Sequence, residues 1–193
     1  MSDEKRKICI IKQGKKYLGG ISIPSDMYRT TDYFNRPGMM RHRDNQGTLD
    51  SYIQLYDVEV IVDSNIVLKR QDVINIRVTD IIFYWDEIDN LGTPVEQKRA
   101  KSMMENIGQP ELNRANMITP MYGSQFYEIS GAFYGRFKRA MVKNFLSLTN
   151  ATVDHFFKKS ETEKWSKKPI ALPYDFVALN MSFVDSYSLK IEE

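Results

Sequence analysis

The chain has 193 residues, 42% of them hydrophobic and 27% charged, and a formal net charge of +2. This length suits one ordinary domain or two small ones, and the composition excludes the low-hydrophobicity, high-charge signature of intrinsic disorder. Because the net charge is close to zero, only local basic clusters give an argument for a nucleic-acid partner.

The single cysteine and the N-terminus bear on the compartment. Cys9 has no second cysteine with which to form an internal disulfide, which favours a reducing environment, and we interpret it as a small core residue. The first residues are charged, and the apolar run that follows them is too short for a signal peptide or a membrane span. We therefore expect a cytoplasmic protein.

The first elements in chain order are two strands. Residues 7–12 alternate weakly between apolar and polar side chains, residues 13–16 are a hairpin-turn signal, and residues 17–23 predict a second strand. Gly19 and Gly20 lie inside that second strand, where glycine marks a bulge or a sharp bend. A phosphate-binding loop would need more glycines and a following helix.

A short helix or an irregular turn is expected over residues 27–34, with Ser25 or Asp26 as its N-cap. Residues 35–49 are rich in Arg, Asp, Asn and Gly and predict a surface loop. The next stretch, residues 52–85, is dense in β-branched and aromatic residues that alternate with polar ones. It predicts three or four short antiparallel strands.

The second half begins with a change in composition. Residues 96–107 are good helix formers and predict a linker helix. After it we expect strands at 123–137, 145–157 and 171–191, a basic helical turn around 136–144 and a charged loop at 158–168. The predicted domains are a first repeat at 6–92, a helical linker at 93–120 and a second repeat at 121–193.

Two segments in each half share a pattern. The order of apolar and polar positions in 52–60 matches that in 145–153, and the order in 73–81 matches that in 176–184. A glycine-bearing strand precedes each pair of segments. Short β patterns also match by chance, whereas a true duplication would give two small curved sheets, packed together or swapped into one larger barrel.

Three segments of the first half, residues 14–21, 53–59 and 76–81, resemble the signature segments of Sm-like small β-barrels. They carry a strand–glycine–strand element, an aliphatic-x-Leu-x-Asp run, and Ile-Arg followed by an acidic residue and an aliphatic one. The resemblance implies five strongly bent strands after a short helix, often assembled into rings. Through residues 20–24 and 32–35 the chain is also similar to uncharacterised bacterial proteins with an Sm-like barrel.

The RNA pocket of that family is changed at two positions. RNA-binding members place a glycine after the arginine and an asparagine before the aliphatic-x-Leu run, where this chain has Val78 and Tyr52. The arginine itself is present as Arg77. Its guanidinium is expected either to stack on a base or to form an ion pair with Asp80 on the surface of the strand.

A basic, aromatic segment after the second strand is the most suggestive surface. Arginine beside aromatic rings suits single-stranded nucleic acid and protein contacts, and the aromatics could equally fill the core. A second basic cluster, which includes Lys138 and Lys143, lies at the corresponding place in the second half and favours an anionic partner. The candidate binding residues are Tyr28, Arg29, Tyr33, Arg36, Arg77, Arg136 and Arg139.

Residues suited to catalysis or metal binding are few. His42 lies in a charged loop, His155 lies near a strand end, and a zinc site would need several such ligands at short spacing. Asp86, Glu87 and Asp89 could bind a hard cation or form a solvated turn. We therefore expect no catalytic residue, no metal and no cofactor.

The sequence as a whole predicts a mainly β protein built from two small bent-sheet barrels of Sm-like type. For its function we expect a non-catalytic interaction or assembly module that self-associates or binds a protein partner through sheet edges and an Arg/aromatic loop surface. The alternative is binding of RNA or single-stranded nucleic acid by an Sm-like barrel.

Overall fold

The computed structural model describes residues 4–24, 27, 29–37, 51–62, 66–87, 112–135 and 143–190. Within these residues the chain is mainly antiparallel β-structure, as its composition predicted. It divides into two compact units, Met1–Asn106 and Ile107–Glu193. The predicted surface loop at 35–49 and the predicted linker helix at 96–107 lie almost entirely outside the described residues.

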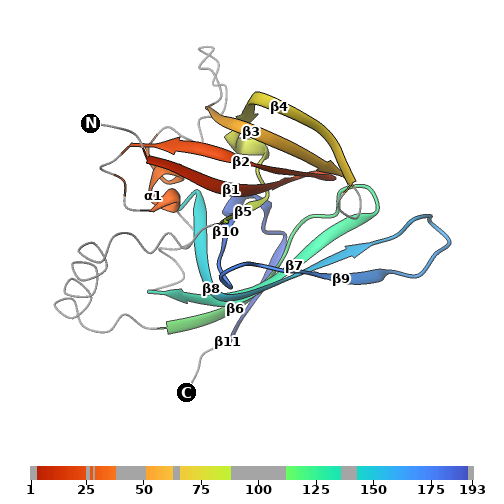
Figure 1. Cartoon of the computed structure of the whole chain (residues 1–193). Coiled ribbons are helices and arrows are strands. Elements are labelled where there is room, and N and C mark those ends of the chain that lie inside the picture. Colours follow the sequence, from red (N-terminus) through yellow and green to blue (C-terminus); the bar gives the residue numbers. More distant parts are fainter. Residues whose placement is uncertain are drawn as a thin grey trace, which may run out of the picture. The chain divides into compact units, whose positions relative to one another are not determined.

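The first unit is an antiparallel sheet with the strand order β5-β1-β2-β3-β4 (Figure 1). Among the described residues no pairing joins β4 to β5, so the sheet stays open and does not form the closed barrel that the sequence predicted. Its elements are β1 (Glu4–Lys12), β2 (Lys15–Ile23), α1 (Thr30–Phe34), β3 (Tyr52–Val62), β4 (Ile66–Arg77), the 3-10 helix η1 (Val78–Asp80) and β5 (Phe83–Asp86).

The core of the first unit gathers around β1, which lies between β2 and β5. Four consecutive residues of β1, from Ile8 to Ile11, are buried, and so are Phe83, Tyr84 and Trp85 of β5. A strand whose consecutive side chains are all buried has both of its faces covered. The weak alternation of residues 7–12 in the sequence has this cause.

The second unit has the strand order β11-β6-β7-β8-β10. The short strand β9 pairs with β8 at residues 153–157, and β10 pairs with β8 at residues 145–148. Its elements are β6 (Leu112–Ile118), β7 (Gln125–Tyr134), β8 (Phe145–Phe157), β9 (Ser166–Ile170), β10 (Val177–Asn180), the 3-10 helix η2 (Met181–Phe183) and β11 (Ser186–Lys190).

Two of these strands lie where the sequence predicted something else. Leu112–Ile118 forms β6, the partner of both β7 and β11, inside the stretch 93–120 that was predicted as a helical linker. Ser166–Ile170 forms β9 and begins inside the predicted charged loop at 158–168. β6 mixes polar with apolar residues and β9 is rich in lysine, and pairing with β7 and β8 overrides their weak local propensity.

The two units have the same pairing pattern. In each unit the second strand shifts its register against the third at a single point among the described residues, between Leu18 and Gly20 in β2 and between Ser130 and Ala132 in β7. In each unit the first strand pairs with both the second and the last strand. The strand orders therefore correspond element by element, with β9 and β10 together in the place of β4.

The two bulges are also built in the same way. Asp57 in β3 and Asn150 in β8 have φ angles of 51° and 48°, a left-handed conformation that short polar residues tolerate. A Cβ added to Gly19 would lie 2.9 Å from a backbone oxygen of β3, and one added to Gly131 would lie 2.8 Å from Cβ of Leu148. Glycine is required at both points because the strands approach so closely.

The turn before the last strand is repeated as well. The backbone N–H of Val78 in η1 donates to the carbonyl oxygen of Ser51 over 3.0 Å, and that of Met181 in η2 donates to Asn144 over 2.9 Å. These pairings define equivalent positions in the two units. Among them are Ile8 and Ala115, Gly19 and Gly131, Asp57 and Asn150, and Arg77 and Asn180.

Candidate functional site

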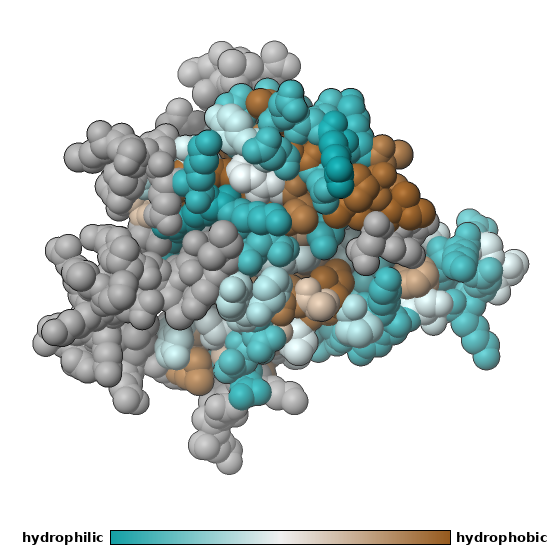
Figure 2. All heavy atoms as spheres, in the orientation of Figure 1, coloured by the Kyte–Doolittle hydropathy of each residue, from teal (hydrophilic) through white to brown (hydrophobic). Residues whose placement is uncertain are grey.

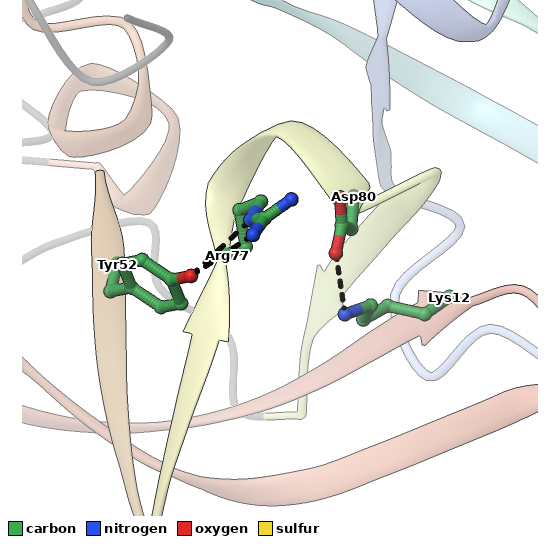
Figure 3. A network of polar contacts seen from close by, with 4 residues as sticks. All are labelled: Lys12, Tyr52, Arg77 and Asp80. Atoms are coloured by element: carbon green, nitrogen blue, oxygen red, sulfur yellow. Dashed lines mark hydrogen bonds and ion pairs between the residues drawn. The ribbon is translucent and has the colours of Figure 1, made fainter. Parts of the chain in front are cut away.

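Arg77 is exposed and belongs to a polar cluster at the end of β4, where η1 begins (Figure 3). Its Nε and Nη2 donate to the hydroxyl oxygen of Tyr52 over 3.3 and 3.2 Å, and its guanidinium carbon lies 5.8 Å from the centre of the Tyr52 ring. Beside this pair, Nζ of Lys12 forms an ion pair with Oδ2 of Asp80 at 3.0 Å. The cluster thus combines two cations, one carboxylate and an exposed ring.

The backbone fixes this arrangement. Tyr52 and Arg77 lie directly opposite each other in the β3–β4 ladder, which brings the hydroxyl within reach of the guanidinium. The next residue, Val78, is fully buried. RNA-binding Sm-like proteins have a glycine after the arginine, so that a base can approach the backbone. In this chain the residue after Arg77 is Val78, whose side chain packs into the core of the first unit.

The equivalent positions of the second unit hold residues of a different kind. Asn180 replaces Arg77, is fully buried, and accepts a hydrogen bond from the backbone N–H of Ser182 over 3.0 Å. Phe145 replaces Tyr52 and is also fully buried. The polar cluster is therefore a feature of the first unit.

The candidate residues around α1 divide into core and surface. Phe34 is fully buried, with its ring centre 4.6 Å from that of Tyr84 in β5. Tyr33 is half-buried, and the guanidinium of Arg36 lies over its ring at 5.2 Å. Arg29 is exposed. Tyr28 lies outside the described residues.

Hydrogen bonds attach α1 to β5. Thr30 Oγ1 donates to Asp86 Oδ1 over 2.8 Å, and the Tyr84 hydroxyl donates to Thr31 Oγ1 over 3.1 Å. Burial, followed by the charge of Asp86, raises the pKa of Tyr84 well above its usual value. The helix is thus a fixed part of the first unit, and it presents Arg29 and Arg36 on a rigid support.

The second basic cluster is described only in part. Lys143 is exposed, while Arg136, Lys138 and Arg139 lie outside the described residues. The correspondence between the two basic surfaces therefore stays a prediction.

β4 is the outermost strand of the first unit and pairs, among the described residues, with β3 alone. Four aliphatic residues on it are largely exposed. They are Ile66 at 63%, Val67 at 42%, Leu68 at 63% and Val73 at 44%. Figure 2 shows apolar atoms gathered at the surface of this unit on the side where β4 starts. A long outer strand with exposed backbone groups is a template for pairing with another chain.

The corresponding edge of the second unit is protected. β9 reads Ser-Lys-Lys-Pro-Ile, and both lysines and proline blunt a sheet edge because they add charge and remove a donor. β10 is short, and all four of its residues are buried. The long, open edge therefore lies on β4.

A basic and aromatic cluster on β7, β8, β9 and the β8–β9 connection was not predicted from the sequence. The rings of Phe126 and Phe156 stack at 4.8 Å with 1° between their planes, and Trp165 meets Phe126 edge-on at 5.1 Å. Nζ of Lys158 lies 4.8 Å from the centre of the Trp165 ring, and Nζ of Lys167 lies 5.4 Å from that of Phe156. The run of lysines and aromatics at 155–168 was the available signal.

The histidine and cysteine have structural surroundings. The ring of His155 stacks on Tyr127 at 4.8 Å, and its Nε2 is hydrogen-bonded to Oε1 of Gln125 over 3.0 Å. Cys9 is fully buried, and burial raises the pKa of its thiol. His42 lies outside the described residues. Within the described residues, no group of three or more His, Cys, Asp or Glu side chains is arranged to hold a metal ion.

No protein-family model, no curated protein and no solved structure matches this chain. The described part of the chain contains no helix with the length and apolar character that a membrane crossing requires. The features of the described residues that bear on function are the polar cluster, the α1 surface, the β4 edge and the aromatic cluster around β7, β8 and β9.

Proposed function

We propose that this chain is a non-catalytic interaction or assembly module of the bacterial cytoplasm that recruits another chain through the edge of β4. The observation that carries the proposal is the burial pattern of this strand. Of its 12 residues, Ile76 alone is buried, although the strand is continuous and paired along its length with β3. Monomeric proteins keep such edges short or blunted.

The proposal includes an origin by duplication of a small Sm-like barrel. Its support is the shared strand order, the equivalent bulges at Gly19 and Gly131, and the equivalent turns at η1 and η2. If the two units arose by duplication, each has an outer strand at the position of β4. In the second unit β9 is short and contains Lys167, Lys168 and Pro169, whereas β4 of the first unit is 12 residues long and contains no proline.

The chemistry of edge pairing fits the side chains of β4. An added strand forms main-chain hydrogen bonds to the outer strand, and alternate side chains give specificity. Exposed Leu68 and Val73 offer apolar surface to a partner strand, at roughly 25 cal/mol for each Å² removed from water. This apolar part of the affinity is not screened by salt.

The test is the molar mass of the full chain, measured by light scattering after size exclusion at low and high salt. We expect association at both salt concentrations, lost in Leu68→Lys because a charge enters the pairing edge. Met121→Lys is the matched control, because Met121 is also 63% exposed and lies outside β4. A monomer at every protein and salt concentration contradicts the proposal, and so does equal loss of association in the two variants.

A second candidate function, binding of single-stranded nucleic acid, is favoured by the aromatic and basic side chains on β7, β8 and β9. Single-stranded binders combine cations with rings on which bases stack. Trp165 is 40% exposed with Lys158 over its ring, and Arg77 pairs with the exposed ring of Tyr52 in the first unit.

This candidate is tested by the affinity for a labelled oligothymidylate over a series of salt concentrations. Each phosphate contact contributes about 0.7 to the slope of log affinity against log salt for single strands. The double variant Lys158→Ala with Lys167→Ala, or Arg29→Ala with Arg36→Ala, is expected to flatten the slope by about 1.4 if its two cations contact phosphates. An unchanged slope in both double variants excludes these surfaces.

A further inference from the structure

The outer edge of β4 carries charges of both signs at its centre. Arg70 and Asp72 flank Gln71, and aliphatic residues lie on either side, with Leu68 before the charges and Ile74 after them. An edge of this kind differs from the lysine-rich type that repels every incoming strand. Its charges fit an opposite charge in a defined place on a partner.

That partner can be another β4. When two antiparallel copies of one strand are related by a two-fold axis, one residue lies opposite itself, and its neighbours lie opposite each other in reverse order. With Gln71 at the centre, Arg70 of one copy lies opposite Asp72 of the other, and this happens twice. The next rung outward places Lys69 opposite Val73, and the rung after it places Leu68 opposite Ile74.

We propose that β4 pairs antiparallel with β4 of a second copy of this chain, with Gln71 opposite Gln71, an inference that rests on the edge-pairing function proposed above. The dimer is isologous, so the same surface serves both copies and the assembly stops at two. The paired segment is 68–74, because the β-bulge against β3 lies at Leu68, between Val67 and Lys69.

The other centres from 69 to 73 are unfavourable because each opposes like charges and none keeps the two Arg70–Asp72 pairs, whereas the Gln71 register opposes no like charges and places Lys69 opposite Val73. Centring on Arg70 or on Asp72 puts that residue opposite its own copy, and centring on Lys69 does the same for lysine. A centre at Val73 places Asp72 opposite Ile74 and Lys69 opposite Arg77. Among the centres from 69 to 73, Gln71 is the one that pairs Arg70 with Asp72.

The existing contact of Arg70 is compatible with this pairing. Its Nη2 lies 2.8 Å from Oε1 of Glu59, directly across the ladder in β3, and its Nε donates to the same oxygen over 3.0 Å. The side chain is nevertheless 78% exposed, and a guanidinium has five N–H donors. Arg70 can therefore bridge Glu59 of its own sheet and Asp72 of the other copy.

The size of the contact sets the expected strength. A ladder over residues 68–74 is about 24 Å long, and a single pair of edge strands covers less than the roughly 1,200 Å² of a standard stable interface. We therefore expect a reversible dimer with a dissociation constant in the micromolar range, about 10 µM in order of magnitude. Measurements must extend to protein concentrations above that value.

Charge reversal with mixing gives a decisive test in the full chain. Arg70→Glu alone and Asp72→Arg alone each oppose like charges across the two-fold axis, and we expect each to weaken its own dimer by about tenfold or more. An equimolar mixture of the two variants opposes unlike charges at both positions. We expect the mixture to form a heterodimer with nearly the affinity of the unchanged chain.

Cross-linking provides a second readout that depends on register. In Gln71→Cys the two introduced thiols face each other, so we expect a covalent dimer on mild oxidation. Lys69→Cys is the matched control because its two thiols lie four residues out of register, and it is expected to cross-link only when mixed with Val73→Cys. The native Cys9 does not interfere, because it is fully buried and its thiol pKa is raised by burial.

The outcomes separate this inference from the function on which it rests. If association depends on Leu68 but the mixture of charge variants stays dissociated, the edge function stands and the self-pairing register is wrong. A particle larger than a dimer would also show that the self-pairing register is wrong while the edge function stands. In that case β4 pairs with a different edge, such as β11 of another copy, and the assembly continues into a ring or filament. A chain that never associates contradicts both proposals.

Discussion

The two units share a backbone plan and differ in what they do with its outer positions. β3 and β4 form a long two-stranded ladder, whereas the equivalent β8 faces two short strands, β9 and β10, separated by the stretch 171–176. In β4 nearly every residue is exposed, and in β10 every residue is buried. The bulges and turns define the fold in both units, so the edges are free to differ.

The same contrast holds at the 3-10 turns. Lys12, Tyr52, Arg77 and Asp80 form a surface polar cluster in which Tyr52 and Arg77 are exposed and Lys12 and Asp80 are half-buried, while their counterparts Thr119, Phe145, Asn180 and Phe183 are all buried. Thr119 accepts a hydrogen bond at Oγ1 from the backbone N–H of Tyr127, over 2.9 Å. The polar groups around η1 lie at the surface of the first unit, whereas those around η2 are part of the core of the second.

The largest effect is expected where the units are most alike. Gly19→Ala and Gly131→Ala each place a Cβ within 3 Å of the neighbouring strand, so each should lower the free energy of unfolding by about 1–3 kcal/mol. Gly20→Ala is the control, because a Cβ there meets its nearest atom at 3.7 Å. Urea denaturation measures all three, and a loss in Gly20→Ala as large as in Gly19→Ala would show that the bulge is not the cause.

The next effect concerns alkaline pH and belongs to the second unit. Burial raises the pKa of Tyr127 to about 12. The raised value means that the folded state favours the neutral phenol, so this stabilisation is complete below about pH 10 and is lost as pH rises from about 10 to 12. The free energy of unfolding should fall by about 1.4 kcal/mol per pH unit there.

Tyr127→Phe is the matched variant for this measurement. The phenylalanine ring keeps the packing against His155 but has no titrating group. Urea midpoints taken across the alkaline range should show a shallower pH dependence in this variant than in the unchanged chain. A parallel pH dependence would assign the loss to other groups, with Tyr84 of the first unit as the first to examine, since burial raises its pKa as well.

A smaller effect tests whether the bulges are equivalent. Asp57→Ala and Asn150→Ala place alanine at a φ near 50°, which costs about 1 kcal/mol relative to residues that tolerate this conformation. Asp57→Gly and Asn150→Gly should leave stability unchanged or raise it slightly. Thermal denaturation of the four variants compares the two sites, and a loss confined to one unit would break the correspondence.

The smallest effect is expected at the polar cluster. Lys12→Ala should change the free energy of unfolding by about 0.5 kcal/mol or less, because its ion pair with Asp80 is partly solvated and screened by salt. Thr119→Ala, at the equivalent buried position, should cost about 1 kcal/mol or more because it removes the hydrogen bond to the Tyr127 backbone. Equal losses would contradict the assignment of one turn to solvent and the other to the core.

Much of the sheet could be predicted from the sequence. The alternation at 145–157 gave β8 with its observed bounds, and the central stretch 52–85 contains three strands, as expected. Glycine in the second strand predicted a bulge or a bend, and the structure has a bulge there, where no other residue fits the close approach at Gly19. These features depend on residues that are close together in the chain, so they can be predicted from the sequence.

The rest depends on partners distant in the chain. β6 mixes polar with apolar residues and β9 is rich in lysine, and both become strands by pairing with β7 and β8. Binding through sheet edges was predicted from the sequence, but which strand is outermost depends on pairings between distant segments. The rings of Phe126 and Trp165 are far apart in the chain, and the hairpins of the second unit bring them together.

The twin bulges also bear on how the chain reaches its fold. Because β2 and β7 present the same register shift to β3 and β8, backbone hydrogen bonding alone does not distinguish the correct partner of each strand. The side chains near the bulges must therefore select the correct partner strand. Val58 packs against Gly19 in the first unit, and Leu148 packs against Gly131 in the second. Mispaired hairpins are a known hazard of repeated domains, and the divergence of the two halves in sequence guards against them.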